Sequence, residues 1–283
     1  MGAPAATVHP IDADAAPGAA QFLKRELDPR VDIGDWISLL QPPWADRGPN
    51  HGFLLRSTDG EIVGVYAAVY SRRGDVTTCN LAAFSVLESY RAHSLRLIRA
   101  LLTQKDVAFT DFSPSGNVVA MNERLGLRRI DTSTRLIVNV PAWSRRARIV
   151  IDHDTIARTL TGADAQAHRD HRDAPACHHL IIVRGDRVCY LVYRRDRRKR
   201  MPLFASPLYL GGDRELLAEH WGLVRGHLLS RGLPFTLAEH RVLGVARGLG
   251  RELSHPRAKM FRGDDVDPAT LDYLYSELAL VRW

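Results

Sequence analysis

The feature of this sequence that most constrains its fold is an internal repeat. Residues 53–65 and residues 179–190 start about 126 positions apart, and each stretch has two hydrophobic runs around a short polar turn. Gly60 and Gly185 each lie in such a turn beside an aspartate, which is the turn chemistry of a β-hairpin. Each stretch therefore predicts a strand, a turn and a second strand.

The repeat continues beyond the hairpins at nearly the same offset. Residues 97–101 correspond to 223–227, where each segment predicts a helix, and residues 107–110 correspond to 233–236, where each predicts a buried strand. A near-constant offset over three blocks is what a duplicated domain leaves behind, although common hairpin–helix–strand units could imitate it. We therefore predict an α/β fold with two domains in tandem, each a mixed sheet with flanking helices.

The length of the chain suits such a duplication. With 283 residues, the sequence is long enough for two domains of ordinary size. A link is expected near residues 141–147, where Pro141 ends a strand-like run and arginines follow. We therefore expect a first domain over residues 1–143 and a second domain over residues 144–283.

The charge of the chain bears on the kind of ligand it could bind. The hydrophobic and charged fractions, 45% and 25%, are typical of a globular protein, and the net charge is +7. Arginine forks match phosphate oxygens, so CoA, a nucleotide or a nucleic acid would suit this charge, while a GC-rich genome would give the same excess of arginine. The basic residues are almost all arginine, and the lysines are Lys24, Lys105, Lys199 and Lys259.

The cysteines and the hydrophobic runs bear on the compartment. Cys79, Cys177 and Cys189 are odd in number and fit neither a metal-ligand nor a disulfide pattern, which predicts reduced thiols and no metal site. Reduced thiols favour the cytoplasm. The first residues do not have the pattern of a signal peptide, and no apolar run approaches the length of about 18 residues that a membrane-spanning helix needs.

A strand that runs through a short turn directly into a helix marks the first half. Residues 78–86 are largely apolar and predict a central strand, and leucine and isoleucine recur at helical spacing over residues 95–102. The first amides of a helix lack intrahelical partners, so this junction could hold a phosphate, with Arg91, Arg96 and Arg99 adding positive charge. Many α/β proteins have such a junction without a ligand.

The residues at this junction resemble the acyl-CoA signature of the GNAT superfamily of acyltransferases. Residues 86–96 resemble the end of the family's central strand and its loop of Arg or Gln, two residues, Gly, one residue, and Gly or Ala, with Arg91 in the first position. Residues 117–127 resemble the family's later helix, which closes in Leu-Gly-Phe and here in Leu-Gly-Leu. The resemblance covers residues 7–140 and implies a GNAT-like domain that binds acyl-CoA.

This resemblance also implies where acetyl-CoA or a longer acyl-CoA would bind. Pantetheine would pair beside Phe84, Ser85 and Val86, and a backbone amide near Val86 would stabilise the oxyanion of the reaction. The pyrophosphate would lie on the loop and helix start that follow. The further residues implied for binding are Arg91, Ala92, His93, Ser94, Leu95, Arg96 and Asn117.

The chain departs from the family where proton transfer is concerned. The tyrosine that many members use as general acid aligns with Asn122, and an amide cannot deliver a proton at neutral pH. Residues 79–85 contain no carboxylate, which leaves Asp111, at the end of the next strand, as the nearest candidate base; the alternative is that it caps the following turn. Ser94 and Arg96 stand where the family prefers glycine. Asp111 and Asn122 are therefore the catalytic candidates.

The second half keeps a strand–helix junction but changes its chemistry. Gly211 and Gly212 precede Asp213, which predicts an N-cap for the following helix. A capping carboxylate satisfies the amides that would otherwise bind phosphate, so we expect a degenerate GNAT-like domain here; the alternative is that the two glycines still allow a phosphate to bind. The basic run at residues 194–200 predicts a solvated hairpin end, and the alternative is a contact for a polyanionic acceptor or RNA. Residues 267–281 predict a helix followed by an apolar strand.

Three functions are open on the sequence. The first is direct transfer of an acyl group from acyl-CoA to the amine or hydroxyl of a small-molecule or peptide acceptor. The second is Fem-type transfer from aminoacyl-tRNA, which also uses two GNAT-like domains and would suit a basic protein that binds RNA. The third is a non-catalytic pseudo-enzyme that binds a CoA ester. The acceptor, the acyl chain length and the oligomeric state stay open.

Overall fold

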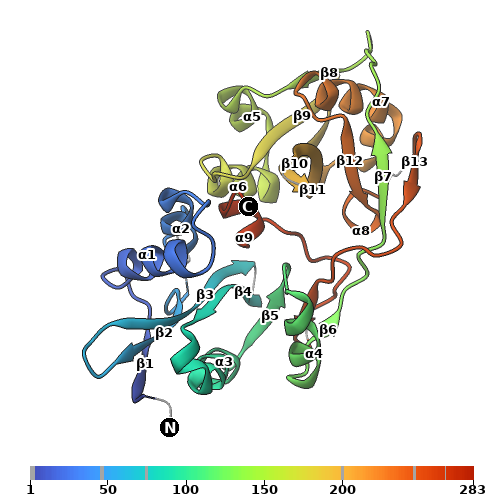
Figure 1. The fold of residues 1–283 in the computed structure, drawn as a ribbon. Coiled ribbons are helices and arrows are strands. Elements are labelled where there is room, and N and C mark those ends of the chain that lie inside the picture. The colour runs from blue at the N-terminus through green and yellow to red at the C-terminus, as the bar shows by residue number, and fades with distance from the viewer. Residues whose placement is uncertain (1–3, 45–47, 74–75, 199–200, 245–246, 265) are drawn as a thin grey trace. The chain divides into compact units, whose positions relative to one another are not determined.

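Two β-sheets of matching topology form the framework of the protein. The computed structural model (Figure 1) describes residues 4–44, 48–73, 76–198, 201–244, 247–264 and 266–283. The first sheet contains, in spatial order, β1 (Ala6–Pro10), β2 (Gly52–Ser57), β3 (Ile62–Arg73), β4 (Val76–Val86), β5 (Val107–Asp111), β14 (Met260–Arg262) and β6 (Arg128–Arg129). The second contains β8 (Arg148–Val150), β9 (His178–Arg184), β10 (Arg187–Arg198), β11 (Met201–Gly212), β12 (Phe235–Glu239), β7 (Thr134–Val138) and β13 (Gly250–Glu252).

The sixth position of each sheet is held by a strand from the other half of the sequence. β14 pairs antiparallel with β5, where Met260 lies opposite Asp111. β7 pairs antiparallel with β12 and with β13, and in Figure 1 its green arrow lies among their orange strands. The two halves therefore exchange one strand each, and the matching strand order agrees with the internal repeat.

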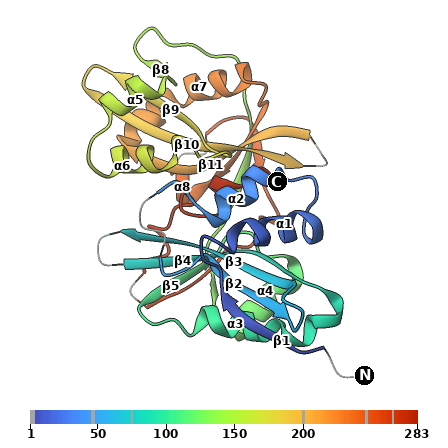
Figure 2. The ribbon, with the colours of Figure 1, turned by 90° about the vertical axis from the view of Figure 1, so that its left-hand side faces the viewer.

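Helices cover both faces of each sheet. In the first unit, α1 and α2 lie on one face of the sheet and α3 and α4 on the other (Figures 1 and 2). The helices of this unit are α1 (Ala16–Glu26), α2 (Ile33–Leu40), the 3₁₀ helix η1 (Glu88–His93), α3 (Ser94–Leu102), α4 (Gly116–Arg124) and α9 (Glu277–Leu280). Those of the second unit are α5 (His153–Thr159), α6 (Gly162–His171), α7 (Arg214–Ser230) and α8 (His240–Leu243).

The local patterns of the first half produce the elements that they predict. The first hairpin turns at Gly60, whose φ of 84° lies in the left-handed region that glycine adopts without strain. Strand β4 lies in the middle of its sheet, as its apolar sequence predicts. Alternate residues of β3 and β4, such as Tyr70 and Cys79, pack into one hydrophobic core with Leu97 and Leu101 of α3.

The backbone contacts divide the chain differently from a linear boundary between residues 143 and 144. The first unit comprises residues 1–130, 258–271 and 275–282, and the second comprises the rest. The difference arises because the exchanged strands take their flanking segments with them. Residues 267–276 form turns, bends and irregular chain rather than the predicted helix, and α9 is the helix of this region.

The basic run of the second half also differs from its prediction. β10 extends through Arg198, so Arg194 lies within a strand, where it is 4% exposed rather than solvated. Lys199 and Arg200 lie outside the described residues. The prediction was wrong for Arg194 because the strand does not end where its hydrophobic pattern ends.

We predict that the exchanged strand β14 stabilises the first unit. Met260 is fully buried in the core with Phe109 and Cys79, so Met260→Ala should lower the free energy of unfolding by about 2–5 kcal/mol. Urea denaturation of the full chain measures this. The control is Met201→Ala, whose side chain is 51% exposed and whose loss should cost at most about 0.5 kcal/mol. Equal effects of the two substitutions would contradict the assignment of β14 to the core.

Candidate active site

A fork between β4 and β5 lies at the centre of the first sheet. The two strands pair in parallel only from Thr77–Asn80 with Val107–Thr110. Beyond this point β4 continues to Val86, and a shift in its register with β3 marks a bulge, which increases the local twist. Among the described residues, the edge of β4 from Leu81 to Val86 therefore has no partner strand from β5.

The residues predicted to pair with pantetheine lie along this open edge. Phe84, Ser85 and Val86 are half-buried, and they pair with β3 on the other side of the strand. The ring of Phe84 lies 4.7 Å from that of Tyr66, centroid to centroid. The fork thus provides a β-strand edge next to an aromatic surface, to which an extended amide-containing chain could bind.

The segment predicted as a phosphate-binding loop is helical. Leu87 is the N-cap of the 3₁₀ helix η1, and the N–H of Tyr90 donates to the Leu87 carbonyl at 2.9 Å. Helix α3 follows directly from Ser94. Arg91 pairs with Glu88 at 2.9 Å, and both side chains are largely exposed. Exposed pairs of this kind contribute little stability, so Arg91 can exchange its partner for a phosphate at small cost.

Two of the predicted phosphate ligands contact the N-terminal segment. Arg96 Nη1 donates to the carbonyl oxygen of Ala6 at 2.6 Å, and His93 Nε2 donates to that of Pro4 at 2.8 Å. The bulky Arg96 side chain is thus directed to β1. Ala92 and Leu95 are exposed, and Ser94 is half-buried. Asn117 lies in the first turn of α4, and its side chain is outside the described part of the structure.

The two catalytic candidates lie in direct contact. Asn122 Nδ2 donates to Asp111 Oδ2 at 2.7 Å, and both residues are buried. Asp111 is the last residue of β5, one position beyond the last pair with β4, so its carboxylate lies where the strands part. Burial, and then the nearby carboxylate of Glu277, raise the pKa of Asp111 to about 7, while the hydrogen bond from Asn122 acts in the opposite direction.

Glu277, which the sequence does not indicate, completes this group. Ser113 N–H donates to Asp111 Oδ1 at 3.3 Å, and Ser113 Oγ donates to Glu277 Oε1 at 2.6 Å. The backbone N–H of Glu277 donates to Oδ1 of Asn80, the last β4 residue paired with β5, at 3.3 Å. Glu277 is fully buried at the start of α9, 164 residues after Ser113. No local pattern could associate residues that far apart.

The corresponding fork in the second unit is filled by its own polypeptide. β11 and β12 pair in parallel only at Phe204–Ala205 with Phe235–Thr236. Beyond this point the N–H of Tyr273 donates to the β11 carbonyl of Leu208 at 3.1 Å. The Tyr273 hydroxyl donates to the carboxylate of Glu239, the last residue of β12. A buried tyrosine thus lies where the first unit has its open edge.

The junction after β11 is closed as well. Asp213 is the N-cap of α7, as predicted, and accepts from Leu216 N–H at 2.9 Å. A Cβ on Gly211 would lie 1.8 Å from Asp164 Oδ1, so this glycine makes room for a carboxylate. Because Gly211 has no side chain, the Asp164 carboxylate can lie against it, and this negative charge would repel a phosphate.

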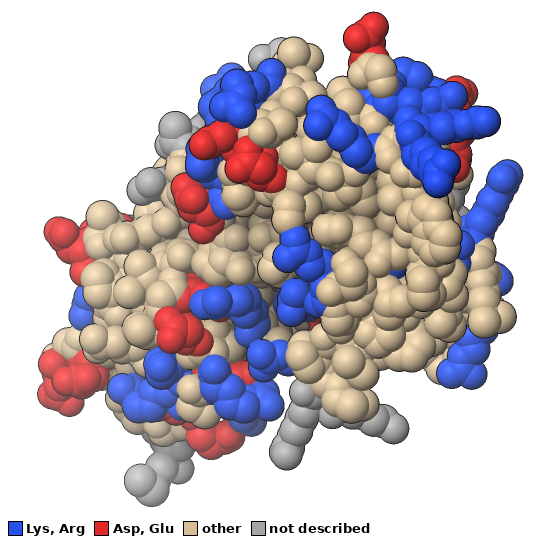
Figure 3. Space-filling model, turned by 90° about the horizontal axis from the view of Figure 1, so that it is seen from above, with Lys and Arg blue, Asp and Glu red and all other residues tan. Residues whose placement is uncertain are grey.

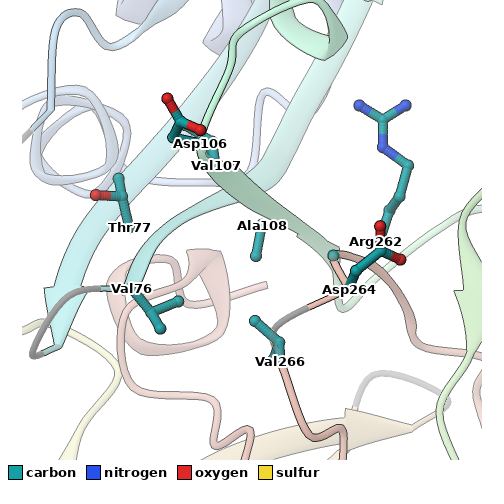
Figure 4. A pocket seen from close by; sticks show the side chains of 9 residues that line it. Val76, Thr77, Asp106, Val107, Ala108, Arg262, Asp264 and Val266 are labelled. Atoms are coloured by element: carbon teal, nitrogen blue, oxygen red, sulfur yellow. The ribbon is translucent and has the colours of Figure 1, made fainter.

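A pocket of about 470 Å³ lies at the opposite end of β5 (Figure 4). Its lining includes Val76, Ala108 and Val266, with the carboxylates of Asp106 and Asp264. The Arg262 guanidinium points away from the valines in Figure 4 and donates to two backbone carbonyls instead. From Ala108 to Asp111 the strand runs about 10 Å, so this pocket is separate from the fork.

The part of the chain that the structure describes contains neither a candidate metal site nor a candidate membrane-spanning helix. No group of three or more His, Cys, Asp or Glu side chains is arranged to hold a metal ion. No helix is long and apolar enough to cross a membrane.

Each sheet has a forked pair of parallel strands, a strand–helix junction and helices on both faces. These features define two GNAT-like α/β domains in tandem.

Solved structures share this fold. A GCN5-related N-acetyltransferase from Anabaena variabilis matches with a TM-score of 0.58 and 12% identity, over 91% of this chain and 72% of that chain. An acetyltransferase candidate from Pyrococcus horikoshii matches with a TM-score of 0.56 and 9% identity, over 98% of this chain and 92% of that chain.

These likenesses are too distant in sequence to show more than the fold. No family profile matches the sequence, and no curated protein matches it. The predicted resemblance to GNAT proteins and the predicted α/β fold of two tandem domains are thus confirmed at the level of structure.

We predict that the Asp111 carboxyl makes the first unit less stable as the pH rises. Its folded pKa of about 7 lies above the ordinary value of 3.8, so the folded state binds the proton more tightly between these values. Stability should therefore fall by roughly 2–4 kcal/mol as the pH rises through this range.

Asp111→Asn should remove most of this fall. Urea denaturation at about pH 5 and about pH 8 measures it. The control is Asp106→Asn at an exposed position with a φ of 57°, which asparagine tolerates. A slope that persists in Asp111→Asn would refute the assignment.

Proposed function

We propose that the first unit transfers an acyl group from acyl-CoA to an amine or hydroxyl acceptor. The observation that carries this proposal is the open edge of β4 from Leu81 to Val86, with the buried carboxylate of Asp111 at the fork. The edge offers backbone groups to the amides of a pantetheine arm. The acetyltransferase names of the structural neighbours support the same chemistry.

The proposed reaction assigns one task to each part of the fork. The acceptor nucleophile attacks the thioester carbonyl, and Asp111 takes its proton, since a base that titrates near neutral pH suits this step. A backbone N–H near Val86 stabilises the oxyanion. Asn122 orients the Asp111 carboxylate through its 2.7 Å hydrogen bond. The CoA thiolate then leaves and is protonated by water.

Only the first unit is proposed to bind acyl-CoA. In the second unit Tyr273 donates to the strand carbonyl of Leu208, and Asp164 lies against Gly211. Both features occupy the places that pantetheine and pyrophosphate would need. The second unit then has a structural role, and the expected stoichiometry is one acyl-CoA per chain.

Transfer from aminoacyl-tRNA is the rival for the same fold. Figure 3 shows lysine and arginine side chains in several separate groups on one face, with acidic groups near some of them. We favour acyl-CoA as the donor because the edge of β4 from Leu81 to Val86 could pair with an extended pantetheine arm.

We predict that Arg91 contributes to acyl-CoA affinity. Its guanidinium lies beside the strand–helix junction and is held only by an exposed ion pair, so Arg91→Ala should weaken binding about tenfold. Isothermal titration with acetyl-CoA and longer acyl-CoAs measures this. The control is Arg214→Ala, at the start of α7 in the second unit, which should leave the affinity unchanged.

The same titration decides between the candidate functions. Absence of binding across the acyl-CoA series would reject the proposal, and binding of tRNA with a steep salt dependence would favour the rival. Binding without release of free CoA in the presence of an amine and hydroxyl acceptor panel would indicate a non-catalytic sensor.

A further inference from the structure

The fork of the first unit contains two buried carboxylates that are joined through one residue. Ser113 donates its N–H to Asp111 and its hydroxyl to Glu277. Asp111 and Glu277 belong to segments far apart in the sequence, yet Asn80 and Ser113 fix Glu277 at the point where β4 and β5 separate. Two buried carboxylates this close cannot both ionise without a large electrostatic cost.

We propose that Glu277 is a positioning residue for acyl transfer, forming with Asp111 a coupled carboxylate pair that takes up the proton of the acceptor. This inference rests on the proposed function. In the reaction, the acceptor N–H or O–H bond breaks as the new bond to the acyl carbon forms. The proton passes to Asp111 of the pair, and the thioester bond breaks to release the CoA thiolate.

The other ionisable groups near the pair do not compete with it for the proton of the acceptor at neutral pH. Tyr66 on β3 lies near both carboxylates, and burial raises the pKa of its hydroxyl, so it stays neutral. Cys79 on β4 belongs to the same hydrophobic core as Tyr66, and burial raises the pKa of its thiol to about 12, so it also stays neutral. On α2, Asp35 is paired with Arg282 at 2.7 Å. Asp111, whose pKa is raised to about 7 by burial and by the Glu277 carboxylate, is thus the group that takes up the proton at neutral pH.

The variant that tests this is Glu277→Gln. Glutamine keeps the oxygen that accepts from Ser113 and removes the charge, so the proton on Asp111 should be lost at lower pH. The acidic limb of the kcat profile should move about one pH unit downward, while acyl-CoA affinity stays unchanged. The control, Glu123→Gln, removes an exposed carboxylate next to Asn122 on α4 that pairs with Arg129, and should shift nothing.

A second measurement does not depend on turnover. The side-chain carboxyl carbon of Asp111, assigned by its absence in Asp111→Asn, can be titrated by ¹³C NMR in the wild-type chain and in Glu277→Gln. We expect its midpoint to fall by about one unit in the variant. Ser113→Ala removes the hydroxyl that donates to Glu277, so the titration midpoint of Asp111 should shift in the same direction. Thermal denaturation checks that this variant is folded.

The outcomes separate the two proposals. Identical Asp111 titrations in the wild-type chain and in Glu277→Gln would overturn the coupled pair, whatever the activity. A shifted titration with an unchanged pH profile of kcat would overturn its role in catalysis. A shifted titration in a chain that neither binds nor cleaves acyl-CoA would instead reject the proposed function.

Discussion

The structure of this protein depends on the hydrogen bonding of β-strand edges. β5 needs a partner on its outer edge, and the chain supplies β14 from near its end, while β7 completes the sheet of the second unit. The same exchange brings the segment after β14 back to the first unit, including α9. The position of Glu277 beside Asn80 is a consequence of this strand pairing.

The inner edge of β5, which faces β4, is paired along only part of its length. Where β4 bulges and leaves β5, the pairing stops, and Asp111 is buried at the fork with Asn122 as its hydrogen-bond partner. A buried carboxyl whose pKa is raised by its surroundings does not help the fold at neutral pH. Such unfavourable groups are concentrated at functional sites, which is why we assign chemistry to this point and not to the pocket at Ala108.

The two units show how one topology can be open or closed. Both have a parallel strand pair that separates, and both end the inner strand in a buried acid, Asp111 or Glu239. In the second unit Tyr273 lies between the strands, and its hydrogen bonds to Leu208 and Glu239 take the place of a binding edge. A filled fork stabilises the unit, whereas an open fork leaves backbone groups for a ligand.

The sequence by itself determined the features that depend on local patterns: the repeat, the hairpins, the central strand and the N-cap at Asp213. The catalytic candidates Asp111 and Asn122 came from the family resemblance and from the position of Asp111 after a strand, and their roles stay predictions. The tertiary structure alone decided which strands exchange, because pairing partners at least 97 residues apart leave no local signal. It also decided that residues 88–93 form a 3₁₀ helix and that Arg96 contacts β1. Glu277 joins Asp111 only through that long-range pairing, so no pattern along the chain could have revealed it.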